Sequence, residues 1–144
     1  MVEVNNLTEA KVNENFIKET INKVLKGEDF SNHAVVSVAL IGPGRMRKLN
    51  KAYRKKNKVT DVLSFPEEKV SFGKFKIGPK EKIQGLGEMV ICPREVKKSS
   101  RRTGASFEHE LKRVIIHGAL HLLGYDHEKE VSDMEDKEKH YLSL

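Results

Sequence analysis

The chain has 144 residues, a length that fits one domain with a hydrophobic core of its own. Hydrophobic residues make up 38% of it, charged residues 33%, and the net charge is +6, which indicates a globular protein with a heavily charged surface. Its longest apolar stretches, residues 34–41 and 114–123, are far too short to span a bilayer, which excludes a membrane-spanning protein.

The first half of the chain is predicted to form two helices and two strands. Residues 13–26 predict a helix that Asn13 caps, because apolar residues recur there with i, i+3, i+4 spacing. Residues 34–41 are β-branched and predict a short buried strand, and residues 61–65 predict a second strand that ends at a proline. Between them, residues 45–57 suit a basic helix. The side chains expected to point inward from that helix are Met46, Leu49 and Tyr53.

The second half is predicted to hold one more strand and three helices. Residues 67–82 mix lysine, glycine and proline and indicate a loop or a weak hairpin. A core strand at 87–92 precedes a short helix that Pro93 opens and that ends at Ser99 or Ser100. Ser106 caps a long apolar helix, and residues 132–142 form a last amphipathic helix. Without an internal repeat or a linker, the whole chain is expected to be one α+β domain.

Positive charge is concentrated in two clusters. Residues 43–60 contain eight cations and no acid, and residues 94–102 contain five cations opposed only by Glu95, whereas the sequence after residue 125 is acidic. Two basic clusters on a small domain are typical of a protein with a polyanionic partner, although a merely solvated lysine-rich surface is a common alternative. The cations are Arg45, Arg47, Lys48, Lys51, Arg54, Lys55, Lys56 and Lys58, followed by Arg94, Lys97, Lys98, Arg101 and Arg102.

Three histidines at the end of the long apolar helix predict a metal site. His117, His121 and His127 stand at i, i+4 and i+10. On a helix the first two are separated by roughly 40° and one turn, so both imidazoles can lean toward one point. The third would point roughly 80° away if the helix continued, so the helix has to stop. Gly124 stands where that turn is needed, since glycine readily adopts the left-handed conformation that ends helices.

The position after the first histidine separates this pattern from that of a zinc peptidase. Zinc peptidases carry a glutamate there as general base, whereas this chain has Gly118. Three protein ligands leave a fourth position open for water, which favours a catalytic over a closed structural site. Together with the basic clusters, such a site favours hydrolysis of a phosphodiester rather than of a peptide. Ordinary histidines on a helix face, bonded to carbonyls or water, are the alternative.

The metal helix is apolar nearly all round, which predicts that it is buried and that its polar strip faces a cleft. Glu110 and Arg113 lie on the same strip as the histidines. They are expected either to hydrogen-bond the imidazoles or to pair with each other near the surface. Asp126 beside the third histidine could orient a ligand or transfer a proton, but turn chemistry explains an aspartate there equally well.

The sequence resembles the YbeY-type rRNA maturation endoribonucleases. The resemblance rests on the histidine motif at 117–127 and on further segments that match in order and spacing from about residue 35 onward. Those segments are Leu49-Asn50, Tyr53-Arg54, Thr60-Asp61-Val62-Leu63-Ser64-Phe65-Pro66 and Gly87-Glu88-Met89-Val90-Ile91-Cys92. The part of the chain at 67–84 matches least, so substrate contacts there are not assigned.

The resemblance implies an α+β fold in which a small mixed four-stranded sheet is flanked by about five helices. It also implies one zinc ion held by His117, His121 and His127 at the end of a buried helix. The implied activity is single-strand-specific RNA cleavage linked to 16S ribosomal RNA 3′-end maturation and ribosome quality control. Ribosomal RNA and the small ribosomal subunit or its factors are then the expected partners. The family's functional arginine falls on Arg54, where a planar guanidinium suits a scissile phosphate.

Two other classes of protein have sequence features in common with this chain. A zinc-stabilised module that binds ribosomal RNA without cleaving it would have the same histidines and basic clusters. A zinc peptidase would have the histidines, but Gly118 disfavours it. The histidines do not distinguish zinc from nickel or another metal that imidazole binds.

The N-terminus and the single cysteine indicate the cytoplasm. Residues 1–6 lack the basic head and apolar run of a secretory signal. Cys92 is the only cysteine, so no internal disulfide can form, which suits a reducing compartment. It could bind a metal, but a buried, inert thiol on a strand is the better interpretation.

Overall fold

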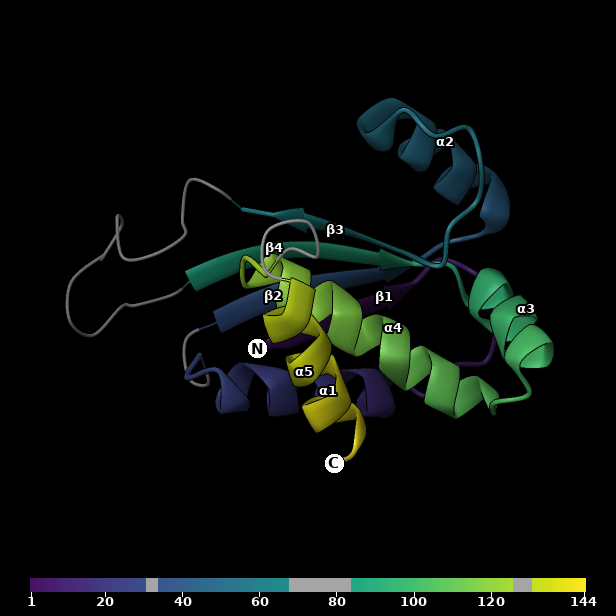
Figure 1. The fold of residues 1–144 in the computed structure, drawn as a ribbon. Helices are drawn as coiled ribbons and strands as arrows, with labels where there is room; N and C mark the ends of the chain where they lie inside the picture. The colour runs from purple at the N-terminus through teal and green to yellow at the C-terminus, as the bar shows by residue number, and fades with distance from the viewer. Residues whose placement is uncertain (31–33, 68–83, 126–130) are drawn as a thin grey trace.

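The computed structural model describes residues 1–30, 34–67, 84–125 and 131–144, which form four strands and five helices (Figure 1). This confirms the predicted α+β class. The elements in chain order are β1 (Val2–Asn6), α1 (Glu14–Gly27), β2 (Ala34–Leu40), α2 (Pro43–Arg54), β3 (Val62–Pro66), β4 (Gln84–Ile91), α3 (Pro93–Thr103), α4 (Phe107–Leu122) and α5 (Val131–Leu142).

The four strands form one mixed sheet in the order β1-β2-β4-β3. The pairs β1–β2 and β2–β4 are parallel, whereas β3 runs antiparallel to β4 and lies at an edge of the sheet. In this register Ser64 of β3 is opposite Met89 of β4, and Val62 is opposite Ile91. Because side chains alternate along a strand, Ser64 and Val62 face one side of the sheet while Leu63 and Phe65 face the other.

The central helix, α4, packs on the sheet with α1 and α5 around it (Figure 1). Its start is fixed locally, because the Ser106 hydroxyl accepts a hydrogen bond from the backbone of His109 at 3.1 Å and two acids stand in the first turn. Leu111, Ile115 and Leu120 are fully or almost fully buried in the main core. The predicted buried helix is therefore confirmed, and its packing on strands and helices makes its last turns a rigid support.

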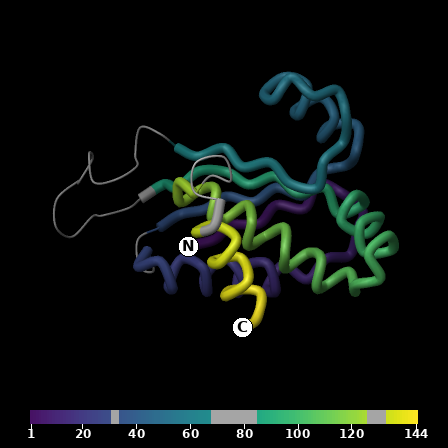
Figure 2. Tube along the Cα trace, in the orientation of Figure 1, coloured from purple at the N-terminus to yellow at the C-terminus, as the bar shows by residue number. Residues whose placement is uncertain are grey.

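The helix α2 lies on the opposite side of the sheet from α1, α4 and α5 (Figure 2). It packs through a second, smaller apolar cluster in which Met46 meets Leu63 and Val90. The prediction that Tyr53 points inward is wrong, since its side chain is 67% exposed. Asn50 instead takes the buried position, because its amide donates to the carbonyl of Lys58 at 2.9 Å and ties the following loop to the helix.

Other elements also differ from the sequence prediction. β1 was not predicted, because its two apolar residues are a weak strand signal until they pair with β2. α2 spans 43–54 rather than 45–57, and the next residue, Lys55, caps it in the left-handed conformation with φ 61°. α3 continues to Thr103, beyond the predicted end at 99 or 100, and Gly104 ends it with φ 80°.

Cys92 is fully buried, as predicted, but it directly follows β4 as the N-cap residue of α3 rather than lying on the strand. Burial raises the pKa of its thiol, which keeps it in the protonated, unreactive form. No helix in the described part of the chain is both long and apolar enough to cross a lipid bilayer.

Candidate active site

A cleft of about 620 Å³ follows the edge strand β3 and joins the ends of α2 and α4. The two helices lie on opposite sides of the sheet, so the cleft brings together residues that are more than sixty positions apart in the chain (Figure 1). It is lined by Tyr53, Arg54, Val62, Leu63, Ser64, Phe65, Pro66, His117, His121, Gly124 and Tyr125.

The two helical histidines meet in this cleft. The Nε2 atoms of His117 and His121 are 3.1 Å apart, and the rings are inclined at 78° with centroids 4.5 Å apart. The predicted convergence of the i, i+4 pair is therefore observed. The pair is only half-buried, so the imidazoles are accessible from the cleft.

The separation of the two nitrogens fits shared binding of one cation. Two nitrogens, each roughly 2.0–2.1 Å from a tetrahedral zinc ion, would be about 3.3 Å apart. The observed 3.1 Å is close to that value, and it equally permits one imidazole to donate a hydrogen bond to the other. The nitrogen donor set itself suits zinc and the neighbouring transition metals.

The third predicted ligand, His127, and its neighbour Asp126 lie outside the described residues. Within the described ranges no cluster of three or more histidine, cysteine or acidic side chains is arranged to hold a metal ion. The structure thus brings His117 and His121 together, and the participation of His127 stays a prediction.

The end of α4 supports the predicted change of direction before the third histidine. Gly124 has φ +99°, and it donates to the carbonyl of His121 at 3.0 Å while Tyr125 donates to that of Leu120 at 3.0 Å. This pair of hydrogen bonds is the Schellman motif, for which glycine is the preferred residue. The helix stops at Leu122, so the chain turns away directly after the second histidine, as the sequence predicted.

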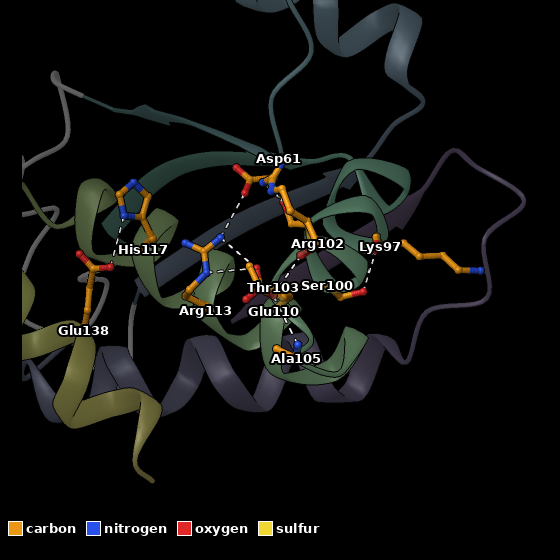
Figure 3. Close-up of polar contacts among 11 residues, drawn as sticks. Asp61, Lys97, Ser100, Arg102, Thr103, Ala105, Glu110, Arg113, His117 and Glu138 are labelled. Carbon is orange, nitrogen blue, oxygen red and sulfur yellow. Dashed lines mark hydrogen bonds and ion pairs between the residues drawn. The ribbon is translucent and has the colours of Figure 1, made fainter.

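A carboxylate that the sequence did not point to lies beside the first histidine. Oε2 of Glu138 on α5 lies 3.5 Å from Nδ1 of His117 (Figure 3). A proton held on Nδ1 by this carboxylate leaves the lone pair of Nε2 directed at the cleft, an arrangement common among metal-binding histidines. Glu138 is 21 residues away on another helix, so no spacing rule points to it.

Glu110 and Arg113, the other polar residues on this strip of α4, pair with each other rather than with the imidazoles. Arg113 lies 3.1 Å from Glu110 and 3.4 Å from Asp61, which precedes β3 (Figure 3). Of the two expectations stated above, the mutual pair is the one observed. The contact with Asp61 also ties α4 to the start of the edge strand that lines the cleft.

Arg54 is the last residue of α2 and lines the same cleft as the histidines. All eight cations of the first basic cluster are exposed, and one of them, Arg54, lines the cleft. The five cations of the second cluster are exposed as well, and all of them lie on α3. A guanidinium that lines one cleft together with two imidazoles can bind and neutralise an anion such as a phosphate.

Glu28 anchors the turn that follows α4. It accepts hydrogen bonds from the hydroxyl of Tyr125 at 2.6 Å and from Tyr141, and Lys137 lies 3.1 Å away. Burial alone would raise the pKa of the Glu28 carboxyl, but these hydrogen bonds outweigh it and hold the pKa below the usual 4.5. One carboxylate therefore joins the end of α1, the residue after Gly124, and α5.

We expect Glu28→Gln to destabilise the protein by about 1–3 kcal/mol near pH 7, because it weakens three hydrogen bonds to a charged acceptor. Since the folded-state pKa is lowered, this stabilisation is present above the unfolded value near 4.5 and is lost as the pH falls through the folded value. Urea unfolding at about pH 7 and about pH 3 measures the difference. Glu19→Gln, an exposed site on the same helix, is the control, and an equal loss at both pH values would contradict a role for the charge.

Comparison with known proteins agrees with the class that this fold and cleft suggest, a hydrolase for an anionic substrate. The matching curated proteins are named endoribonucleases, which supports an endoribonuclease as the class of this protein. The family model described as "Endoribonuclease YbeY" matches residues 3–144, nearly the whole chain. The chain therefore belongs to the YbeY family, as its motifs predicted.

Two relatives illustrate the extent of the similarity. An Endoribonuclease YbeY of Aquifex aeolicus is 47% identical over 98 residues, which are 68% of this chain and 59% of the relative. An Endoribonuclease YbeY of Bacillus cereus strain G9842 is 37% identical over 128 residues, which are 88% of this chain and 82% of the relative.

The fold also matches a solved structure. The solution structure of TM1509 from Thermotoga maritima is similar with a TM-score of 0.62 and 30% sequence identity. The match covers 99% of this chain and 87% of the other, so the overall fold is shared.

Proposed function

We propose that this protein is a zinc-dependent endoribonuclease that cleaves single-stranded RNA during 16S ribosomal RNA 3′-end maturation and ribosome quality control. The observation that carries the proposal is the pair of imidazoles 3.1 Å apart in a cleft that Arg54 also lines. Family membership supports the nuclease class, and the positive surface on α2 suits a polyanion. Ribosomal RNA in the small subunit is the proposed partner, following the resemblance described above.

His117 and His121, with His127 as the third ligand that the motif predicts, would hold the zinc ion. A bound zinc ion supplies Lewis acidity for phosphodiester hydrolysis. Glu138 keeps the proton of His117 on Nδ1, so that Nε2 is available as a donor atom. Arg54 binds the scissile phosphate and offsets the negative charge that develops on its oxygens.

Purified protein incubated with a single-stranded fragment of the 16S 3′ region, with and without a chelator, tests this proposal. Cleavage that the chelator abolishes and zinc restores is the expected result. RNA binding without cleavage would instead indicate a zinc-stabilised module, and cleavage of unstructured protein would indicate a peptidase.

We expect Arg54→Ala to lower kcat for RNA cleavage by roughly 10²–10³-fold while zinc content stays unchanged, because a charge-stabilising donor is lost without touching the metal ligands. Arg54→Lys should recover only part of the rate, since an ammonium group lacks the planar fork of guanidinium. Arg45→Ala, which removes an exposed cation of the same helix that does not line the cleft, is the matched control. Unchanged cleavage by Arg54→Ala would exclude this role.

A further inference from the structure

Tyr53 presents an aromatic ring to solvent at the mouth of the cleft. Its side chain is 67% exposed, although it belongs to a helix whose inner face is buried. Its ring meets that of Phe65 edge-on, with centroids 5.1 Å apart and planes inclined at 72°. Phe65 is itself half-buried and packs against the second apolar cluster, so it supports the Tyr53 ring from the sheet side.

The backbone around Tyr53 is held in place on both sides. The left-handed Lys55 closes α2 by donating to the carbonyl of Lys51 at 3.2 Å. The buried amide of Asn50 binds the carbonyl of Lys58, and Arg47 donates to Asn57 at 2.9 Å. The loop after the helix is thus folded back onto α2, which fixes the backbone that carries the neighbouring pair Tyr53 and Arg54.

This pair has the two features that single-stranded nucleic acid needs. Unpaired bases stack on aromatic faces, whereas the bases of a duplex are already stacked and inaccessible. Arg54, the next residue of α2, lines the same cleft and is available to contact a phosphate, and the remaining exposed cations of α2 extend the positive surface. An extended peptide could also lie along the edge strand β3, but a surface with eight cations and no acid between residues 43 and 60 favours a polyanion.

We propose that Tyr53, supported by Phe65, forms a stacking platform for one unpaired nucleobase next to the phosphate bound by Arg54. The proposal rests on the proposed function, because it assigns the nucleobase subsite of the same cleft. It gives single-strand specificity a physical origin in an exposed ring rather than in the histidine pair.

The absence of tryptophan from the chain makes a direct test possible. Tyr53→Trp introduces the only tryptophan, whose fluorescence is quenched when a base stacks on it. In stopped-flow mixing, before turnover, we expect quenching by single-stranded RNA and little quenching by a duplex or by a strand that is abasic throughout. Leu7→Trp, at a 49% exposed site beside the opposite edge strand, is the matched control and should respond to none of them.

Steady-state cleavage supplies the second measurement. Tyr53→Ala should raise KM for single-stranded RNA roughly 5- to 150-fold, the loss expected for one base-aromatic stack, with a much smaller change in kcat. Tyr53→Phe keeps the aromatic face and should recover most of that affinity. Because Tyr53 is exposed, the far-UV circular dichroism of all variants should match the wild type.

The outcomes separate this proposal from the proposed function. If single strands quenched the fluorescence of a protein that cleaves no RNA, the stacking platform would be supported and the proposed nuclease activity would be refuted. If the Tyr53→Ala variant cleaved single-stranded RNA with the wild-type KM, the stacking platform would be refuted and the proposed nuclease activity would be supported. Equal quenching by duplex or abasic strands would also refute the platform, as would quenching by an unstructured peptide alone.

Discussion

We expect the His121→Ala protein to lose its zinc and to cleave single-stranded RNA at roughly one thousandth of the wild-type rate or less. His121 supplies one of two nitrogens that lie 3.1 Å apart, and alanine leaves His117 as the one imidazole of α4 that lines the cleft. The fold should persist, because His121 is only half-buried at the cleft and alanine is the best helix former. Metal analysis, an RNA cleavage assay and far-UV circular dichroism on the same samples measure the three quantities.

A smaller loss of zinc affinity is expected when Glu138, the carboxylate next to His117, is changed. Glu138→Gln keeps the shape but removes the charge that holds the proton on Nδ1, and loss of such a partner weakens metal binding about 10- to 100-fold. Glu135→Gln, an exposed change on the same helix, should leave zinc affinity unchanged. Full cleavage by zinc-free His121→Ala would refute metal-dependent hydrolysis. If the wild-type protein cleaved no RNA and unfolded when its zinc was removed, the zinc site would be structural.

The sequence was most informative where a structural choice is made by a few neighbouring residues. Asn13 caps α1 by accepting a hydrogen bond from Phe16, and Ser106 caps α4 in the same way. Gly124 ends α4 with a positive φ that other residues rarely adopt. Because caps and stops depend on contacts within five residues, their residue types and spacing predicted both ends of α4. The convergence of His117 and His121 followed from the same local geometry.

What the sequence did not reveal depends on contacts between distant segments. Strand β1 has only two apolar residues and exists through pairing with β2. Hydrophobic periodicity predicts that Tyr53 points inward. In the structure Tyr53 is exposed, and Asn50 takes the buried position, where it binds the carbonyl of Lys58. Glu138 reaches His117 only because α5 packs against α4. Two of these features, the exposed Tyr53 and the contact between Glu138 and His117, belong to the cleft. They could therefore be found only from the three-dimensional structure.

The second large effect is expected at Gly118, the position where zinc peptidases carry their glutamate. In the structure Gly118 is buried against the sheet. A Cβ there would lie 3.0 Å from the Sδ and Cε atoms of Met89, which is fully buried, and 3.1 Å from Oγ of Ser64. The Ser64 hydroxyl also donates to the Gly118 carbonyl at 2.9 Å. The glycine thus lets α4 approach β3 and β4 closely, and its α-carbon faces the sheet rather than the cleft.

We therefore expect Gly118→Glu to destabilise the protein by about 3 kcal/mol or more, because it forces a carboxylate into a tightly packed contact with Met89 and Ser64. It should not create peptidase activity, since the new side chain starts from the buried face of the helix. Gly118→Ala should cost less than about 2 kcal/mol, because alanine's helix propensity offsets part of the overpacking. Urea unfolding measures both losses, and an assay on unstructured protein measures the activity.

His109→Glu, an acid introduced at an exposed position in the first turn of the same helix, controls for the added charge and should change stability by less than about 0.5 kcal/mol. A Gly118→Glu protein that unfolds at the wild-type urea concentration would show that α4 and the sheet have room at this contact. If that protein also digested unstructured protein, position 118 would face the cleft after all. The close packing at Gly118 predicts neither result, and it gives a physical reason why the peptidase glutamate is absent from this position.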